Sequence, residues 1–540
     1  MYLSFSTTGQ YQLYASPSQR RDAETIIFDV LKRCPPALID TQTGRLCHGP
    51  LQILTLEVDP TYRNLLSSIG ERGQERFRRG VETFFEYVMF SHKWDETCEE
   101  PSFQDILGKS VYNDLDRSPT NDKLRKFCET VRETGHRWAW SDTCCIDRTD
   151  SFVVNRAIVS MYRWYKESAL TLALLSSIVP PSKLGDLRDS IWMRRAWTLQ
   201  ELLAPRAIRF YDSEWKPYLN DPHHNHRDSP VINAELASAI SVGSRTLSAF
   251  RPGDLGVREK LRLASTRAAK YEEDIAYSLF GIFASDLQPN YGEGKDALGR
   301  LLEEIVHRSG DVTVLAWTGS SSAFNSCLPA EIAVYKEPPQ TVSPSNLNKL
   351  RTRAVELQSL LPREATVAIY GQISNLPKAS FVNRRLHLPC IVFAINRLTR
   401  VAQGPQWHVY RASVSMLGDV GIRTADPLPS RGLLLVHPWI RNLLDPPGKI
   451  TQNFDVDKKA DLSLLHGVAS LASDDYIRGL WLIARLGLKF SALLLEQQPY
   501  HGYKRVAADH EIVVQLPRII SSQEICTQVL DVWGGHTGLL

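Results

Sequence analysis

Four short apolar runs alternate with amphipathic segments between residues 86 and 211, and this alternation restricts the fold more than any other feature. The predicted strands are Tyr87–Phe90, a run beginning at Arg137, Leu170–Leu175 and Ala207–Tyr211. The segments between them carry apolar residues at helical spacing, as at Leu124, Phe127 and Val131. Strands and helices in this order form a parallel sheet covered by helices on both faces. We therefore predict an α/β fold of that kind.

The sequence pattern divides the rest of the chain into three further segments. Residues 1–85 form a mixed N-terminal segment, and residues 217–335 are a loop and a helical extension of the α/β domain at 86–216. From residue 336 the sequence becomes strand-like again, with proline-rich joints. This pattern predicts a second, β-rich C-terminal domain of unknown role at 336–540.

Composition excludes several functional classes. The formal net charge of +3 is too small to favour a nucleic-acid or anionic-membrane partner. No apolar run reaches membrane-spanning length and no secretory signal opens the chain, so we expect a cytoplasmic protein. Nine scattered cysteines fit reduced thiols. The histidines at 223, 224 and 226 lie in a loop without supporting carboxylates, so we predict no metal and no cofactor.

Six polar residues lie just beyond the ends of the first two predicted strands. They are Ser91, His92, Trp94, Asp142, Cys145 and Asp147. Right-handed crossovers bring the carboxyl ends of parallel strands to one rim, where ligands bind in such sheets. We therefore predict that these residues shape a substrate-binding pocket.

The segment Asp189–Pro205 is predicted to be one helix with two unlike faces. Its apolar stripe consists of Trp192, Ala196, Leu199 and Leu203. Arg194, Trp197 and Glu201 fall on the opposite side, at i, i+3 and i+7. An indole between an arginine and a carboxylate suits a pocket or a partner. An ordinary solvated face is the alternative, and both stay open at this point.

Four blocks in this order resemble the heterokaryon incompatibility (HET) domain of filamentous fungi. The blocks are Tyr87–Trp94, Trp140–Asp147, Ala157–Tyr165 and Arg195–Pro205. Later segments resemble what commonly follows that domain, so the likeness covers about residues 86–335. It implies a role in fungal self/non-self recognition, in which such domains trigger the death of fused cells. The nucleotide-binding loop and repeats of many members are not visible, so the trigger and the protein partner stay unknown.

The HET domain is in turn distantly similar to Toll/interleukin receptor (TIR) domains, whose strand order is flavodoxin-like. Ser190-x-Trp192 and Trp197–Leu202 look like the TIR block in which a serine, a tryptophan and a glutamate begin the third helix. In TIR domains that hydrolyse NAD, that glutamate is catalytic. The resemblance thus implies Glu201 as the catalytic residue and NAD as the substrate. It also implies self-association on activation, because a neighbouring subunit often completes TIR-type sites.

The chemistry of NAD cleavage fits these residue types. Nicotinamide leaves through an oxocarbenium-like state that the carboxylate of Glu201 can stabilise, and no general acid is needed because the leaving pyridine is neutral. Arg194 is expected to favour the ionised carboxylate and to contact a phosphate. Trp197 is expected to stack on a ring, and Ser91 to contact phosphate oxygens.

Two interpretations from other classes stay open. The first is a non-enzymatic signalling or interaction module that acts by assembly through the same rim. The second is a cysteine hydrolase that uses Cys144 or Cys145 with His92, although no third orienting residue is evident. The sequence does not decide whether the protein is an enzyme.

Overall fold

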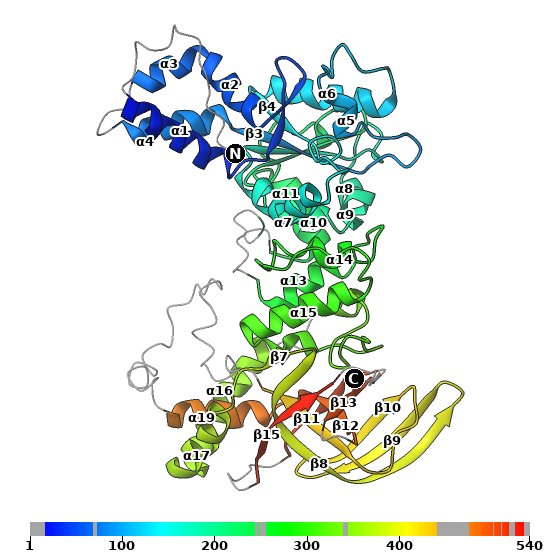
Figure 1. Ribbon diagram of the computed structural model, residues 1–540. Helices are drawn as coiled ribbons and strands as arrows, with labels where there is room; N and C mark the ends of the chain where they lie inside the picture. The colour runs from blue at the N-terminus through cyan, green and yellow to red at the C-terminus, as the bar shows by residue number, and fades with distance from the viewer. Residues whose placement is uncertain are drawn as a thin grey trace. The chain divides into compact units, whose positions relative to one another are not determined.

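The computed structural model describes residues 17–67, 73–243, 247, 255–337, 344–439, 475–499, 502–508, 510–517 and 524–533 (Figure 1). The chain divides into two compact units. The first comprises residues 1–254, 267–270 and 277–289, and the second comprises residues 255–266, 271–276 and 290–540. None of the described helices is both long and apolar enough to cross a lipid bilayer.

A six-stranded sheet forms the centre of the first unit. Its strands, in spatial order, are β2 (Arg45–His48), β1 (Ala37–Asp40), β4 (Trp138–Trp140), β3 (Tyr87–His92), β5 (Leu170–Leu174) and β6 (Ile208–Tyr211). The last four strands are parallel to one another. Every residue of β3 and of β5 is buried. Strands buried on both faces require continuous apolar runs, which explains why these segments do not alternate.

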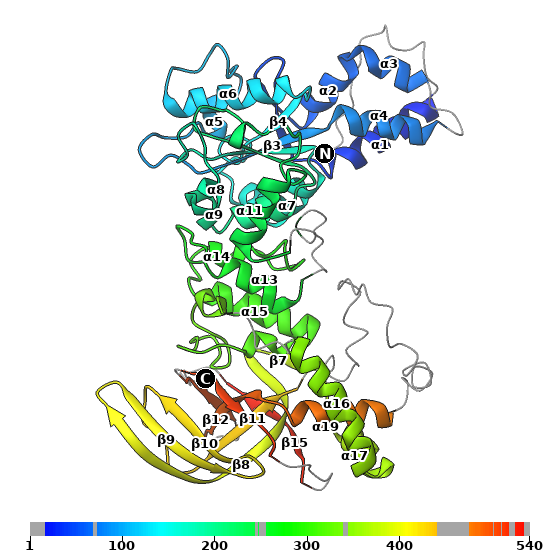
Figure 2. The same cartoon turned by 180° about the vertical axis from the view of Figure 1, so that it is seen from behind.

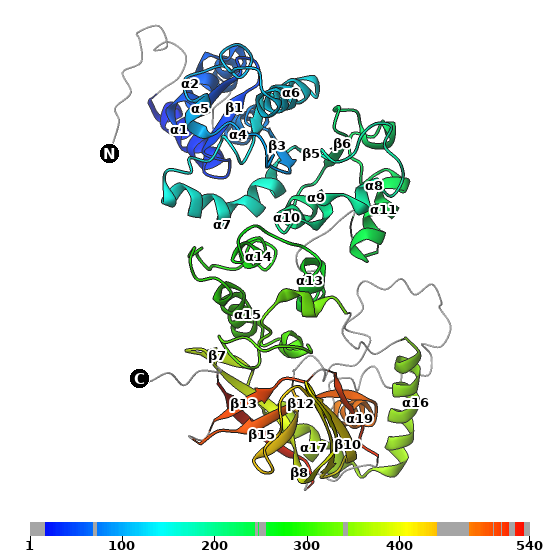
Figure 3. The same ribbon diagram turned by 90° about the vertical axis from the view of Figure 1, so that its right-hand side faces the viewer.

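Helices cover both faces of this sheet, as the α/β prediction requires. The helices of the first unit are α1 (Pro17–Leu31), α2 (Pro50–Val58), α3 (Pro60–Ser67), α4 (Gln74–Phe84), α5 (Phe103–Ile106), α6 (Pro119–Glu133), α7 (Ser151–Glu167), α8 (Asp186–Asp189), α9 (Ile191–Arg194), α10 (Thr198–Leu203) and α11 (Pro230–Ile240), with the 3-10 helix η1 (Tyr218–Asn220). Figure 3 shows α6 on one side of β3, β5 and β6, with α7, α9 and α10 on the other.

The prediction of a purely parallel sheet is wrong at one edge. Strand β1 pairs antiparallel with β4, and β2 pairs antiparallel with β1. Both strands come from the N-terminal segment, where the turn between Asp40 and Arg45 uses Gly44 at φ +70. A short hairpin can join the edge of a parallel sheet without a crossover, which makes the sheet mixed.

The second unit contains a helical part and a β-rich part. Its helices are α13 (Val257–Ala264), α14 (Asp274–Tyr277), α15 (Asp296–Ser309), α16 (Pro344–Leu360), α17 (Arg363–Ser374) and α19 (Asp475–Leu486), with the 3-10 helices η3 (Val312–Leu315) and η4 (Ile332–Tyr335). Helix α19 packs on α16 and α17 (Figure 2). The Leu, Ile and Tyr side chains of these helices join one apolar core with the strands.

A nine-stranded sheet confirms the prediction of a β-rich C-terminal region. Its strands are β7 (Ser380–Val382), β8 (Arg385–Gly404), β9 (Trp407–Val414), β10 (Gly418–Thr424), β11 (Leu433–Pro438), β12 (Phe490–Gln497), β13 (Tyr503–Val506), β14 (Ile512–Val514) and β15 (Cys526–Val532). Strand β8 also pairs with β15, so the path β8-β11-β12-β13-β15 closes on itself. Two register shifts bend the long strand β8 where it pairs with β9.

Candidate functional site

A buried group of three residues, here called the Glu201 cluster, lies at the carboxyl end of β3. The hydroxyl of Ser91 donates a hydrogen bond to the carboxylate of Glu201, and the indole N–H of Trp192 donates to Ser91 Oγ over 2.8 Å. The exposed fractions of the three residues are 0%, 8% and 2%, in the order Ser91, Glu201 and Trp192. The structure therefore brings together two predicted site residues, Ser91 and Glu201, and adds Trp192, which the sequence assigned to the apolar core.

A break in the predicted helix 189–205 creates this geometry. The chain leaves helical conformation after Arg194 and re-enters it at Thr198. At the break, the Ala196 N–H donates to the Ala268 carbonyl over 2.8 Å, and the Ala268 N–H donates to the Arg194 carbonyl over 2.7 Å. Backbone groups that would have bonded within the helix are thus satisfied by a distant segment. Glu201 points into the protein as a result.

Arg267 fixes the turn between α9 and α10. One of its guanidinium nitrogens donates to the Arg195 carbonyl and to Thr198 Oγ1, each over 2.9 Å. The Thr198 hydroxyl in turn lies 2.5 Å from the Trp192 carbonyl. Arg267 is itself buried. Nothing in its sequence context marked it as part of the site, because it lies 66 positions after Glu201 and outside the recognised blocks.

The carboxyl group of Glu201 has an unusual acidity. Burial raises its pKa to about 7, and the nearby charge of Asp142 pushes in the same direction, whereas the Ser91 hydrogen bond and the positive charges of Arg195 and Arg267 lower it. Burial also lowers the pKa of Arg267 to about 10. Arg194, which the sequence suggested as the partner of Glu201, is exposed. The neighbouring residue Arg195 supplies the charge instead.

Trp94 and Asp142 meet where the loops after β3 and β4 come together. The Trp94 indole donates to the Asp142 carboxylate over 2.9 Å. The guanidinium of Arg148 stacks 4.3 Å from the centre of the Trp94 ring and lies 3.9 Å from Asp142 Oδ2. These side chains join the loop after β3 to the loop after β4.

His92 faces the opposite side of the sheet from Ser91, because side chains alternate along a strand. Its ring stacks on Phe90, with centroids 4.1 Å apart. Neither ring nitrogen has a hydrogen-bond partner, although Nε2 lies 3.8 Å from the Glu100 carboxylate. Burial holds the pKa of His92 well below its usual value, so the ring is neutral and this contact is not an ion pair.

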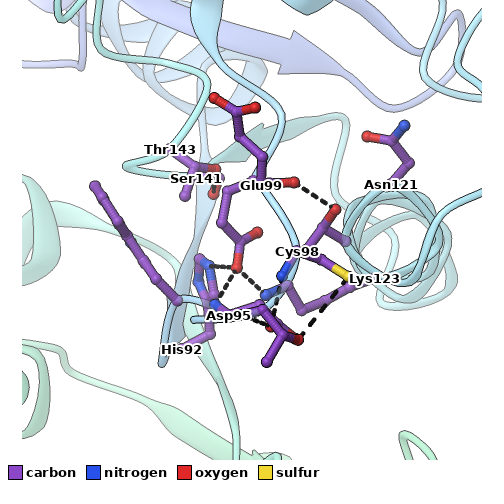
Figure 4. A network of polar contacts seen from close by, with 12 residues as sticks. His92, Asp95, Cys98, Glu99, Asn121, Lys123, Ser141 and Thr143 are labelled. Atoms are coloured by element: carbon purple, nitrogen blue, oxygen red, sulfur yellow. Dashed lines mark hydrogen bonds and ion pairs between the residues drawn. The ribbon is translucent and has the colours of Figure 1, made fainter.

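Glu100 instead pairs with Lys123 of α6, and its carboxylate also accepts the Asp95 N–H over 2.8 Å. Figure 4 shows His92, Asp95 and Lys123 gathered in this network. Burial raises the pKa of Glu100, while the contact with Lys123 lowers it. These contacts hold the loop after β3 against α6.

The remaining predicted site residues are Asp147, Trp197 and Cys145, and each has a different environment from Glu201. Asp147 is a loop residue whose carboxylate accepts the Thr149 N–H over 3.0 Å. Trp197 is half-buried at the start of α10. Cys145 is buried, and burial raises the pKa of its thiol well above the usual value. A thiol in this state is a poor nucleophile, which argues against the cysteine hydrolase interpretation.

The fold and the site together define the first unit as an α/β domain with a buried acid at the carboxyl end of its central strand. The family described as heterokaryon incompatibility protein (HET) matches residues 87–186. Vegetative incompatibility protein HET-E-1 of Podospora anserina is 32% identical over 228 residues, which cover 41% of this chain and 16% of that protein. No solved structure matches the chain. Residues 87–186 therefore form a HET domain, and the chain spans about a sixth of the length of this relative.

Proposed function

We propose that this protein acts in heterokaryon incompatibility and that its HET domain delivers the effect. The match over residues 87–186 and the likeness to a vegetative incompatibility protein support this role. The match includes β3, β4, α7 and β5, which carry Ser91 and the rim loops. The other two residues of the Glu201 cluster, Trp192 and Glu201, follow in α9 and α10.

The chemistry proposed for this domain is hydrolysis of NAD to nicotinamide and ADP-ribose. The observation that carries it is a buried glutamate, Glu201, whose pKa is raised to about 7 at the carboxyl end of β3. Strongly shifted acids at the ends of parallel strands are typical of catalytic sites. The strand order β4-β3-β5-β6 is also the order of the first four strands in flavodoxin-like sheets, to which TIR domains are similar.

In the proposed reaction, water attacks C1′ of the nicotinamide ribose while the bond from C1′ to the ring nitrogen breaks. The bonding electrons leave with neutral nicotinamide, and the proton of the water passes to the Glu201 carboxylate and then to solvent. Ionised Glu201 also stabilises positive charge on the ribose. The rate of nicotinamide release should then rise as the pH increases through about 7, the pKa of Glu201.

Substrate has to replace the internal partner of Glu201 for this reaction to occur. The carboxylate accepts the hydrogen bond of Ser91, which is fully buried, so a ribose hydroxyl must take the place of the Ser91 hydroxyl. Self-association on activation is proposed as the event that opens the site. In the open site, Arg194 is proposed to contact phosphate and Trp197 to stack on a ring.

The enclosure of Glu201 favours a second candidate, a signalling module that acts by assembly without catalysis. A carboxylate that is only 8% exposed and bonded to Ser91 can serve as a buried polar element that fixes the turn between α9 and α10. In that case the rim loops would bind a protein partner, and Glu201 would contribute only to folding.

Release of nicotinamide from NAD by the purified full chain, at high concentration, separates the two candidates. We expect Glu201→Gln to lower the release about a hundredfold or more. The matched control is Glu133→Gln at the exposed end of α6, which should leave it unchanged. Equal release by the parent and by Glu201→Gln would reject hydrolysis. Incompatibility that persists in cells expressing folded Glu201→Gln would favour the assembly module.

A further inference from the structure

A cavity lies in the first unit, on the face of the sheet that α6 covers. Its volume is about 530 Å³, within the range of roughly 300–1,000 Å³ that is usual for small-molecule sites. It is lined by α6, by Leu174 at the end of β5 and by Ser176 and Ser213 just beyond β5 and β6. It therefore lies at the carboxyl ends of parallel strands, where sheets of this type bind ligands.

This cavity and the Glu201 cluster lie on opposite faces of the sheet. Phe127 of α6 stacks on Phe90 of β3 with centroids 4.3 Å apart, whereas Ser91 bonds to Glu201 of α10. Adjacent residues of a strand point to opposite faces. A ligand in this cavity would therefore not occupy the proposed reaction site.

The lining of the cavity is basic. Its charged residues are Arg117, Asp122, Lys123, Arg125, Lys126 and Glu129, an excess of two positive charges. Lys123 is committed to Glu100, and Arg125 donates to the carbonyls of Val111 and Leu115. Arg117 and Lys126 form ion pairs at the surface with Asp122 and Glu129, and 79% and 44% of the two basic side chains are exposed. Such pairs contribute little energy, so both cations can turn to an anion.

Trp215 forms the aromatic wall of the cavity. Its indole stacks on Phe90 with centroids 5.6 Å apart, which continues the ring stack that includes His92 and Phe127. The backbone of Trp215 has φ +62, a conformation that a bulky L-residue rarely adopts. The buried Asp212 holds this turn, because its carboxylate accepts the Lys216 N–H over 3.0 Å and its carbonyl accepts the Trp215 N–H over 3.0 Å.

We infer that this cavity binds a nucleoside phosphate as an effector. The ring of the base would stack on Trp215, and the phosphates would contact Arg117 and Lys126. Ser176 and Ser213 line the same cavity, and serine hydroxyls can donate to phosphate or sugar oxygens. Occupation would tie α6 to the ends of β5 and β6.

The test is calorimetric titration of the full chain with ADP, which has no nicotinamide bond to hydrolyse. We expect ADP to bind and the double variant Arg117→Glu with Lys126→Glu to weaken binding about tenfold or more. Arg156→Glu with Lys166→Glu, at two exposed positions on α7, is the charge-matched control and should change the affinity less than about twofold. Glu201→Gln should leave ADP binding intact.

Two simpler probes separate the halves of the site. Adenosine and inorganic pyrophosphate should each bind more weakly than ADP, because each lacks one set of contacts. Pyrophosphate that binds as tightly as ADP would overturn the role of Trp215. The inference is also overturned if ADP does not bind at millimolar concentration, or if Glu201→Gln abolishes binding while the double variant does not.

Discussion

Ser91 and His92 are neighbouring residues of β3, and each lies beside a buried carboxylate. The two carboxylates differ in the groups that contact them. Ser91 holds Glu201 on one face of the sheet, and His92 lies beside Glu100 on the other. Burial raises the pKa of both carboxyl groups. Glu100 has Lys123 as a direct cationic partner, whereas the direct partner of Glu201 is a neutral hydroxyl.

Both carboxylates are buried, so burial alone does not distinguish a structural carboxylate from a catalytic one. The difference lies in the group that contacts the carboxylate, which is a lysine for Glu100 and a hydroxyl for Glu201. A lysine in contact keeps a carboxylate ionised and fixed, so the pair serves to fasten two elements. A hydroxyl lets the carboxyl group change protonation near neutral pH without breaking its contact. The Glu100–Lys123 pair therefore has a structural role, and Glu201 is the candidate catalytic residue.

The largest expected effect is that of Lys123→Met on the Glu100 network. The variant leaves a buried carboxylate without its cation, because only 14% and 9% of the two side chains are exposed. We expect the free energy of unfolding to fall by about 4 kcal/mol, as measured by urea denaturation at pH 7. Adding Glu100→Gln should restore most of this loss. Unchanged stability in the single variant would contradict the structural role of the pair.

The second effect concerns Glu201→Gln and the pH dependence of stability. A carboxyl group with a folded-state pKa raised from 4.5 to about 7 stabilises the fold fully below pH 4.5, and this contribution is lost as the pH rises to 7. Glutamine does not titrate. Relative to the parent, we therefore expect the variant to gain about 3 kcal/mol of unfolding free energy between pH 4 and pH 8.

Unfolding curves of the parent and of Glu201→Gln at several pH values check this expectation. Glu133→Gln, an exposed position, should track the parent throughout. If the difference between Glu201→Gln and the parent does not change between pH 4 and pH 8, folding does not raise the pKa of Glu201, and the comparison with Glu100 fails.

Much of the first unit could be predicted from the sequence, because its signals are local. Apolar runs such as Tyr87–Phe90 and helical spacing after Pro119 depend on neighbouring residues, and the four parallel strands appear where they were expected. The hairpin β1–β2 was missed because its eight residues carry no distinctive alternation. The apolar run at Val312 has the composition of a strand but forms the 3-10 helix η3 after the Asp311 cap.

The candidate site shows where local signals end. The sequence identified Ser91 from its place at the end of a predicted strand and Glu201 through a resemblance, but it placed Glu201 on an outward face because it assumed one continuous helix. The break depends on Ala268, some seventy residues away, whose backbone pairs across Arg195. Helical spacing contains no information on such a long-range contact. For the same reason the sequence selected Arg194 and missed Arg267.

Arg267→Met tests the long-range contact and should have the third largest effect. It removes the donors to the Arg195 carbonyl and to Thr198 Oγ1, so we expect a loss of about 2 kcal/mol in unfolding free energy. It also removes a positive charge that lowers the pKa of Glu201, so the pH midpoint of the Glu201 contribution should move upward. Arg267→Lys should restore the midpoint more than the stability. A midpoint that moves downward would contradict the electrostatic role.

Arg194→Gln should have the smallest effect, and that small effect distinguishes the structure from the continuous-helix interpretation. If the helix were continuous, Arg194 would face Glu201, and its loss would raise the pKa of the carboxyl group. In the structure Arg194 is exposed, and Arg195 and Arg267 supply the charge. We therefore expect a change in unfolding free energy within about 0.5 kcal/mol and no shift in the pH midpoint. A midpoint shift as large as that of Arg267→Met would restore Arg194 as the partner, and the two carboxylates on either face of β3 would then both be held by direct cations.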